Sequence, residues 1–157
     1  MTTIQTLNKV VEIAEKRRDE ALGALGQMQR ELRVAQDQMD QLQAYAQEAE
    51  QRWATRSSVG VDVALLMHHR QFMAKIDHAL EFQRGVLSER AAFIERAQDQ
   101  VHVCERDVAG LRKFTERKQL AVQHRLQRQD QKNTDEMALA IHLRQSLARA
   151  QQEGIRT

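Results

Sequence analysis

The chain has 157 residues, contains no proline, and combines 29% charged residues with only 4% aromatic ones. This composition is typical of long helices and coiled coils, because it offers too few large apolar side chains to fill the core of a thick globular domain. Its 24 basic and 22 acidic residues leave a formal net charge of +2. Global electrostatics therefore favours neither nucleic acid nor an anionic lipid surface as a partner.

Cysteine content and the length of apolar runs predict the cellular location of the protein. A single cysteine, Cys104, excludes an internal disulfide. No signal-peptide pattern precedes Ile4, and no apolar run approaches the roughly 20 residues that a membrane-spanning helix needs. We therefore expect an intracellular, soluble protein without direct membrane insertion.

A heptad repeat begins at Ile4 and continues to Trp53, with apolar residues at alternating spacings of three and four. Its a positions are Ile4, Val11, Arg18, Leu25, Leu32, Met39, Ala46 and Trp53, and its d positions are Leu7, Ala14, Ala21, Met28, Ala35, Leu42 and Ala49. An apolar repeat of about 3.5 residues stays buried over such a length only against a partner helix in a left-handed supercoil. The repeat predicts a helix over about residues 4–54, which would be about 75 Å long.

A cluster of serine, glycine and β-branched residues then interrupts the repeat. Because serine and glycine favour turns, we expect a hairpin turn over about residues 55–62 and a second helix over about residues 63–150. Either Ser58 or Asp62 could cap this helix, since a short oxygen-bearing side chain accepts a hydrogen bond from an unpaired N–H of the first turn.

The second helix carries its own apolar repeat, interrupted by His69, Gln83 and Arg90. Its members are Leu66, Met73, Ile76, Leu80, Leu87, Ile94, Ala97, Val101, Cys104, Val108 and Leu111, with a less regular continuation through Phe114, Val122 and Leu126. Folding back near Val59 would place Tyr45 near Met73, Leu25 near Ile94 and Ile4 near Thr115, so both repeats end together. At Arg18 and Arg90 we expect the aliphatic stems to pack in the seam while the guanidinium groups reach water.

The predicted fold is therefore all-α, a two-helix antiparallel coiled-coil hairpin in one elongated domain over residues 1–157. The C-terminal helix overhangs as an arm from about residue 116, because the first helix supplies no partner beyond that point. The arm begins in a basic stretch, Arg112 to Lys132, and regains amphipathic spacing after it. Long isolated helices are marginally stable, so we interpret the arm as a partner-binding segment that frays alone. Its candidate contact residues are Arg125, Arg128, Lys132, Asp135 and Glu136.

The sequence contains no Gly-rich phosphate loop, no HExxH or CxxC motif and no Ser-centred elbow. His68 and His69 point in different directions on a helix, and His102 lies off the face of Cys104. We therefore expect no catalytic residue, no metal site and no cofactor. The basic stretch could contact phosphates, but it lacks interleaved aromatic residues, so a solvated face or an acidic protein partner is the preferred interpretation.

Two short stripes lie side by side near the predicted turn when the chain is folded back. They are Gln38, Leu42 and Tyr45 on the first helix, and Phe72, Ile76 and Ala79 on the second. Leu42 and Ile76 belong to the seam, whereas Tyr45 and Phe72 flank it. The stripes are either the edge of the seam or a surface for partner recognition, since aromatic residues on a charged surface are enriched in binding hot spots.

The pattern resembles the FliJ family of flagellar export proteins over nearly the whole chain. The matching features are the heptads from Ile4, the neighbourhood of Tyr45, the segment HRQFMAKI at 69–76 and the segment QDQKNTDEMA at 129–138. The resemblance implies a non-enzymatic, cytoplasmic component of the flagellar type III export apparatus, similar to the central stalk of rotary ATPases and held peripherally at the inner face of the membrane.

The resemblance also implies partners and contact residues. The hairpin would insert into the hexameric flagellar export ATPase and contact the cytoplasmic domain of the export gate, a membrane protein. The residues that contact the gate would be Gln38, Leu42, Tyr45, Phe72, Ile76 and Ala79. Two neighbours depart from the family pattern: Ala49 stands where an aromatic residue can, and Gln83 where a histidine can.

Three other interpretations remain open at this point. The chain could escort export chaperones through its basic arm, an activity that the family is also associated with, or it could be a generic coiled-coil scaffold. A basic coiled coil that binds nucleic acid is the third and least favoured, and steep salt dependence of duplex binding would distinguish it.

Overall fold

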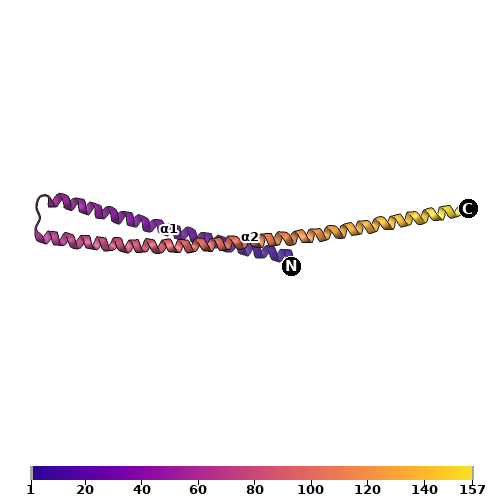
Figure 1. The fold of residues 1–157 in the computed structure, drawn as a ribbon, viewed down its shortest axis with the longest axis horizontal. Coiled ribbons are helices and arrows are strands. Elements are labelled where there is room, and N and C mark those ends of the chain that lie inside the picture. The colour runs from indigo at the N-terminus through magenta and orange to yellow at the C-terminus, as the bar shows by residue number, and fades with distance from the viewer. Residues whose placement is uncertain (1, 157) are drawn as a thin grey trace. The chain divides into compact units, whose positions relative to one another are not determined.

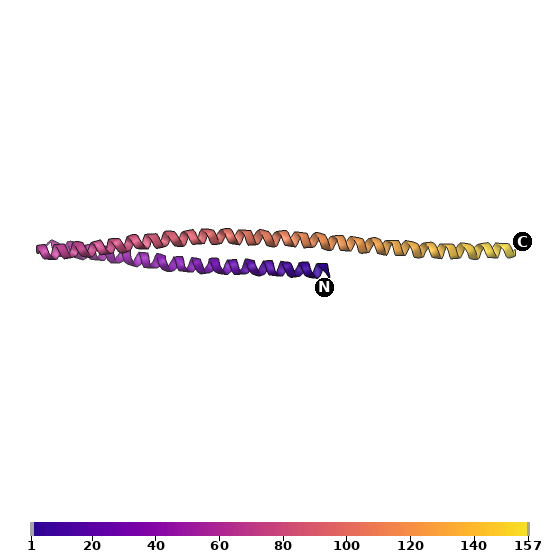
Figure 2. The same cartoon turned by 90° about the horizontal axis from the view of Figure 1, so that it is seen from below.

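The computed structural model describes residues 2–156 and contains two helices. Helix α1 spans Thr3–Ser57 and helix α2 spans Val63–Ile155. The two run antiparallel and pack as a hairpin, and α2 is the longer (Figures 1 and 2). The all-α antiparallel hairpin predicted from the two heptad repeats is therefore confirmed. Both helices continue a few residues beyond the ends expected near residues 54 and 150.

Contacts divide the chain into two compact units, and each takes residues from both helices. The first unit, here called the hairpin unit, comprises Ile13–Val108. The second, here called the terminal unit, combines the residues up to Glu12 with those from Ala109 onward.

The core of the hairpin unit is the predicted seam. Every predicted a and d position from Ala14 to Trp53 is buried or half-buried, and so is every predicted seam position from Leu66 to Val108. The most deeply buried apolar side chains of this unit are Ala14, Ala35, Met39, Ile76, Val101, Cys104 and Val108. The burial confirms the register and shows a narrow core one layer deep.

Polar residues in the seam find partners instead of breaking it. The Gln83 amide is buried, and its Nε2 donates to the backbone oxygen of Ala35 on α1 at 2.8 Å. Arg90 pairs with Glu31 across the two helices at 2.9 Å. The side chains of Arg18 and Arg90 are 26% and 41% exposed, respectively, so their stems pack as expected while their charged ends stay accessible.

The turn between the helices depends on one glycine. Gly60 adopts φ 97°, a left-handed conformation that side chains with a Cβ rarely adopt. Ser58 lies before this point, and its Oγ donates to the backbone oxygen of Thr55 at 2.7 Å. The backbone oxygen of Asp62 accepts from the N–H of Leu66 at 3.1 Å. Asp62 therefore stands at the N-cap position of α2, and Ser58 lies just after the end of α1.

In the terminal unit, the first turn of α1 is closed by a capping box. The Thr2 N–H donates to Gln5 Oε1 at 3.0 Å, and the Gln5 N–H donates to Thr2 Oγ1 at 3.2 Å. This reciprocal pair satisfies N–H groups that the helix itself leaves unpaired. The predicted seam residues Ile4, Leu7 and Val11 of this unit are half-buried.

On α2 of the same unit the predicted continuation is wrong at Phe114. That side chain is 40% exposed, whereas Thr115 is 6% exposed and donates its hydroxyl to the backbone oxygen of Leu111 at 2.8 Å. The reason is the alternation of spacings, which requires a step of four after the step of three from Val108 to Leu111. Val122 and Leu126 are also exposed, as is every described residue from Leu120 to Arg156.

Candidate functional site

The residues expected to contact the export gate all lie in the hairpin unit, at different depths. Ile76 is a seam residue at 6% exposure. Leu42 and Ala79 are half-buried, and Gln38 is exposed. Only part of the expected set is therefore available at the surface, and Ile76 lies in the seam beneath it.

The structure brings Tyr45 and Phe72 together across the two helices. Their ring centroids are 6.0 Å apart with an interplanar angle of 78°, an edge-to-face arrangement. Tyr45 is 48% exposed and Phe72 is 37% exposed. The pair thus packs on itself yet leaves a large part of both rings open to a partner.

The two flanks of the seam differ in chemistry. The aromatic flank consists of Gln38, Tyr45 and Arg52 on α1 with Leu65, Phe72, Ala79 and Val86 on α2, each seven residues after the last. The polar flank consists of Gln36, Gln43 and Glu50 with Arg70, Asp77 and Arg84, all of them exposed, and its series ends at the turn with Val63, which is 72% exposed. Apolar surface therefore gathers on one side of the same seam, which is the pattern of a binding face.

Towards the turn, the aromatic flank ends in a small hollow, here called the turn hollow, with a volume of about 190 Å³. One wall is the Trp53 indole stacked on the His69 imidazole, with centroids 4.1 Å apart and planes 4° from parallel. The complete lining is Tyr45, Ala49, Arg52, Trp53, Arg56, His69 and Phe72.

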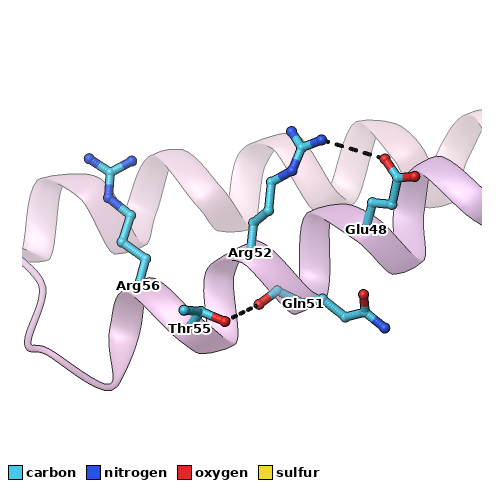
Figure 3. A pocket seen from close by; sticks show the side chains of 5 residues that line it. All are labelled: Glu48, Gln51, Arg52, Thr55 and Arg56. Atoms are coloured by element: carbon cyan, nitrogen blue, oxygen red, sulfur yellow. Dashed lines mark hydrogen bonds and ion pairs between the residues drawn. The ribbon is translucent and has the colours of Figure 1, made fainter.

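Arg52 and Arg56 border the turn hollow and also a neighbouring groove on α1 (Figure 3). Both project from the same side of α1, one helical turn apart (Figure 3). Arg52 forms a long ion pair with Glu48 at 3.5 Å, and both of these side chains are mostly exposed. The Arg56 guanidinium has no hydrogen bond or ion pair within residues 2–156, so it is available to a partner.

Sequence reasoning missed the contribution of Arg52, Trp53, Arg56 and His69 to this surface. It assigned Trp53 and His69 to the seam, where they are half-buried, without recognising that they stack. The available signal was that the only tryptophan of the chain and a seam histidine both lie within a few turns of the hairpin loop.

The two departures from the family pattern have different structural consequences. Ala49 lines the turn hollow, and its small side chain leaves space where an aromatic ring would fill it. Gln83 turns into the seam, where it donates to Ala35 and, at 3.4 Å, to Gln38 Oε1. The Gln83 side chain therefore bonds across the seam and also holds the side-chain amide of Gln38.

The candidate arm residues lie in the terminal unit, and all are exposed. Arg128, Lys132 and Asp135 line one shallow groove on α2, and Gln131 bonds to Asp135 at 3.5 Å. Arg125 and Glu136 do not line it. The structure therefore gathers three of the five candidates.

Within the described part of the chain, no group of three or more His, Cys, Asp or Glu side chains is placed to hold a metal ion. Neither α1 nor α2 contains, over the residues described, a segment apolar and long enough to cross a bilayer.

Comparison with known proteins identifies the family. The family model described as flagellar FliJ protein matches residues 3–147. Searches of curated proteins and of solved structures each found no match.

Proposed function

The chain belongs to the flagellar FliJ family, and we propose that it is the stalk that couples the hexameric export ATPase to the cytoplasmic domain of the export gate. Family membership makes it a component of the flagellar export apparatus, in a family of structural and generally non-enzymatic proteins. The proposal adds the two partners and the surface that binds one of them.

The observation that carries the proposal is the unequal chemistry of the two flanks. The edge-to-face pair of Tyr45 and Phe72 presents partly exposed rings on one side of a seam whose other side is polar. Partly exposed aromatic side chains supported by packed neighbours are typical of interface hot spots. We assign gate binding to the aromatic flank, which includes Ala79, with the seam residues Leu42 and Ile76 beneath it.

A helical hairpin without catalytic groups can link two assemblies by presenting different surfaces to each. Inserted into a ring of identical subunits, an asymmetric coiled coil contacts some subunits differently from others. Those differential contacts shift the populations of subunit conformations, which is how a stalk influences an ATPase without chemistry of its own.

Gate binding is tested by titrating the purified cytoplasmic domain of the gate against Tyr45→Ala and Phe72→Ala. Each change should weaken binding by about 1 kcal/mol or more, which is about fivefold, because it truncates a hot-spot ring. Melting curves and stimulation of the ATPase ring should stay close to those of the unaltered protein, since both rings flank the core.

Matched controls on the polar flank are Gln43→Ala and Arg70→Ala, which should leave gate affinity unchanged. If the aromatic variants lower the melting temperature while gate affinity holds, the pair is a structural edge of the seam and the assignment is wrong.

A second activity, escort of export chaperones, is favoured by the exposed apolar residues of the arm. Met137 and Ile141 are 66% and 53% exposed, and their spacing of four residues places them on one face of α2. In a pull-down with purified export chaperones, Ile141→Asp should reduce capture while gate binding is retained. Unchanged capture would argue against escort through this face.

A further inference from the structure

We infer that the turn hollow receives an acidic side chain of the gate domain, whose carboxylate pairs with Arg52 and Arg56 while its neighbours pack on Tyr45 and Phe72. This inference rests on the proposed function for the identity of the partner. It adds a charged contact at the end of the aromatic flank nearest the turn, and it requires that the partner carry an acidic side chain there.

The charges of the turn hollow are the first argument. Its lining contains two arginines and a histidine but no carboxylate. Arg56 has no ion pair among the described residues, and Arg52 holds Glu48 only at 3.5 Å, with that carboxylate 61% exposed. Two guanidinium groups one turn apart on one side of a helix can converge on a single carboxylate through charge-assisted hydrogen bonds.

The surroundings of the two arginines are the second argument. The stacked rings of Trp53 and His69, together with Tyr45 and Phe72, make three aromatic side chains and one imidazole in the lining. A partner side chain that enters there is covered by rings that displace water, and loss of water strengthens a charge pair. The small side chain of Ala49 leaves the space open.

The same features favour an acidic protein segment over nucleic acid. Binding of single strands commonly uses free aromatic faces for base stacking, but one face of Trp53 is already covered by His69. Glu48 is exposed beside Arg52 on α1, so an extended polyanion would meet a repulsion that one local carboxylate can avoid. The hollow of about 190 Å³ suits a side chain.

The test uses Trp53 as a reporter, because it is the single tryptophan of the chain. In the full-length protein labelled with ¹⁵N-tryptophan, one indole N–H signal is expected, and it should shift when the unlabelled gate domain is added. Arg56→Glu should weaken gate binding by about tenfold, with a stronger loss for Arg52→Glu combined with Arg56→Glu. Arg56→Gln should give an intermediate loss.

Arg84→Glu on the polar flank is the matched charge reversal and should change gate affinity less than about twofold. Arg56 carries the decisive variant because its guanidinium has no hydrogen bond or ion pair to lose within the described residues. It lies in the last turn of α1, where a carboxylate opposes the helix dipole, so melting curves should show a small loss of stability. Gate affinity is therefore compared at a temperature where both proteins are folded.

The outcomes separate this inference from the proposed function. If Tyr45→Ala weakens gate binding while Arg56→Glu does not and the Trp53 signal stays fixed, the hollow is empty and only this inference falls. If the gate domain does not bind at all, both fall. If a short DNA, single-stranded or duplex, shifts the Trp53 signal as strongly as the gate domain does, the arginines bind phosphate and the inference is wrong.

Discussion

Replacing the buried glutamine of the seam tests how the two helices hold their register. In Gln83→Ala the hydrogen bond to the Ala35 backbone oxygen is lost, with a net contribution of about 0.5–1.5 kcal/mol. One buried methylene is also lost, worth about 0.8 kcal/mol. Ala35 lies inside α1, so its carbonyl keeps a helical partner and adds no desolvation cost. We expect the free energy of unfolding to fall by about 1–2 kcal/mol.

The assay is urea denaturation followed by circular dichroism, with Gln71→Ala as the control. Gln71 is exposed on the same helix, so its replacement measures only the gain in helix propensity that alanine brings. Gln83→Leu should stay within about 1 kcal/mol of the unaltered protein, since an apolar side chain of similar size replaces the hydrogen bond by packing. Equal stability of Gln83→Ala and Gln71→Ala would refute the contribution assigned to this contact.

Three further variants and measurements test the rest of the fold. Leu25→Asp should lower the melting temperature sharply, because it places a charge in a seam where burial of the leucine contributes about 1.5–3 kcal/mol, and an unchanged curve would count against the seam. Amide exchange should be slow around Leu25 and Ile94 and fast over residues 120–156, which are exposed in the free protein, and uniform protection would mean that the arm is packed. Gly60→Ala should lower the stability of the protein by about 1 kcal/mol, because Gly60 has a positive φ. Gly85→Ala, where the new methyl group meets open space on α2, should leave the stability unchanged or raise it, and thermal denaturation measures both variants.

The hairpin was predictable because a two-helix seam is a one-dimensional pattern. Alternation of three and four residues fixes which side chains face the partner, and a single cluster of serine and glycine fixes where the chain reverses. The same regularity identified Tyr45 and Phe72 as flanking residues. Folding the two helices back at the turn also brings their positions side by side, whereas the edge-to-face angle of the rings is known only from the structure.

The chemistry of polar seam residues was less predictable, because it depends on which atoms meet across the interface. In the sequence, Gln83 interrupts the apolar repeat of the second helix. In the structure its amide donates to a backbone oxygen of α1, and a pattern of side chains cannot predict that acceptor. Trp53 and His69 stack through ring orientation, and the register specifies only their positions. The error at Phe114 has another cause. Phe114 was predicted as a seam residue because its side chain is large and apolar, although the spacing of the repeat places Thr115 in the seam.

Site-specific photo-crosslinking in swimming cells tests most directly whether the aromatic flank contacts the export gate. A photoreactive amino acid replaces Gln38 on the aromatic flank or, in a second strain, Gln43 on the polar flank, both exposed on α1. The proposal predicts a crosslink to the export gate protein from position 38 and none from position 43. Crosslinking from position 43 alone, or equally from both, would contradict gate binding by the aromatic flank.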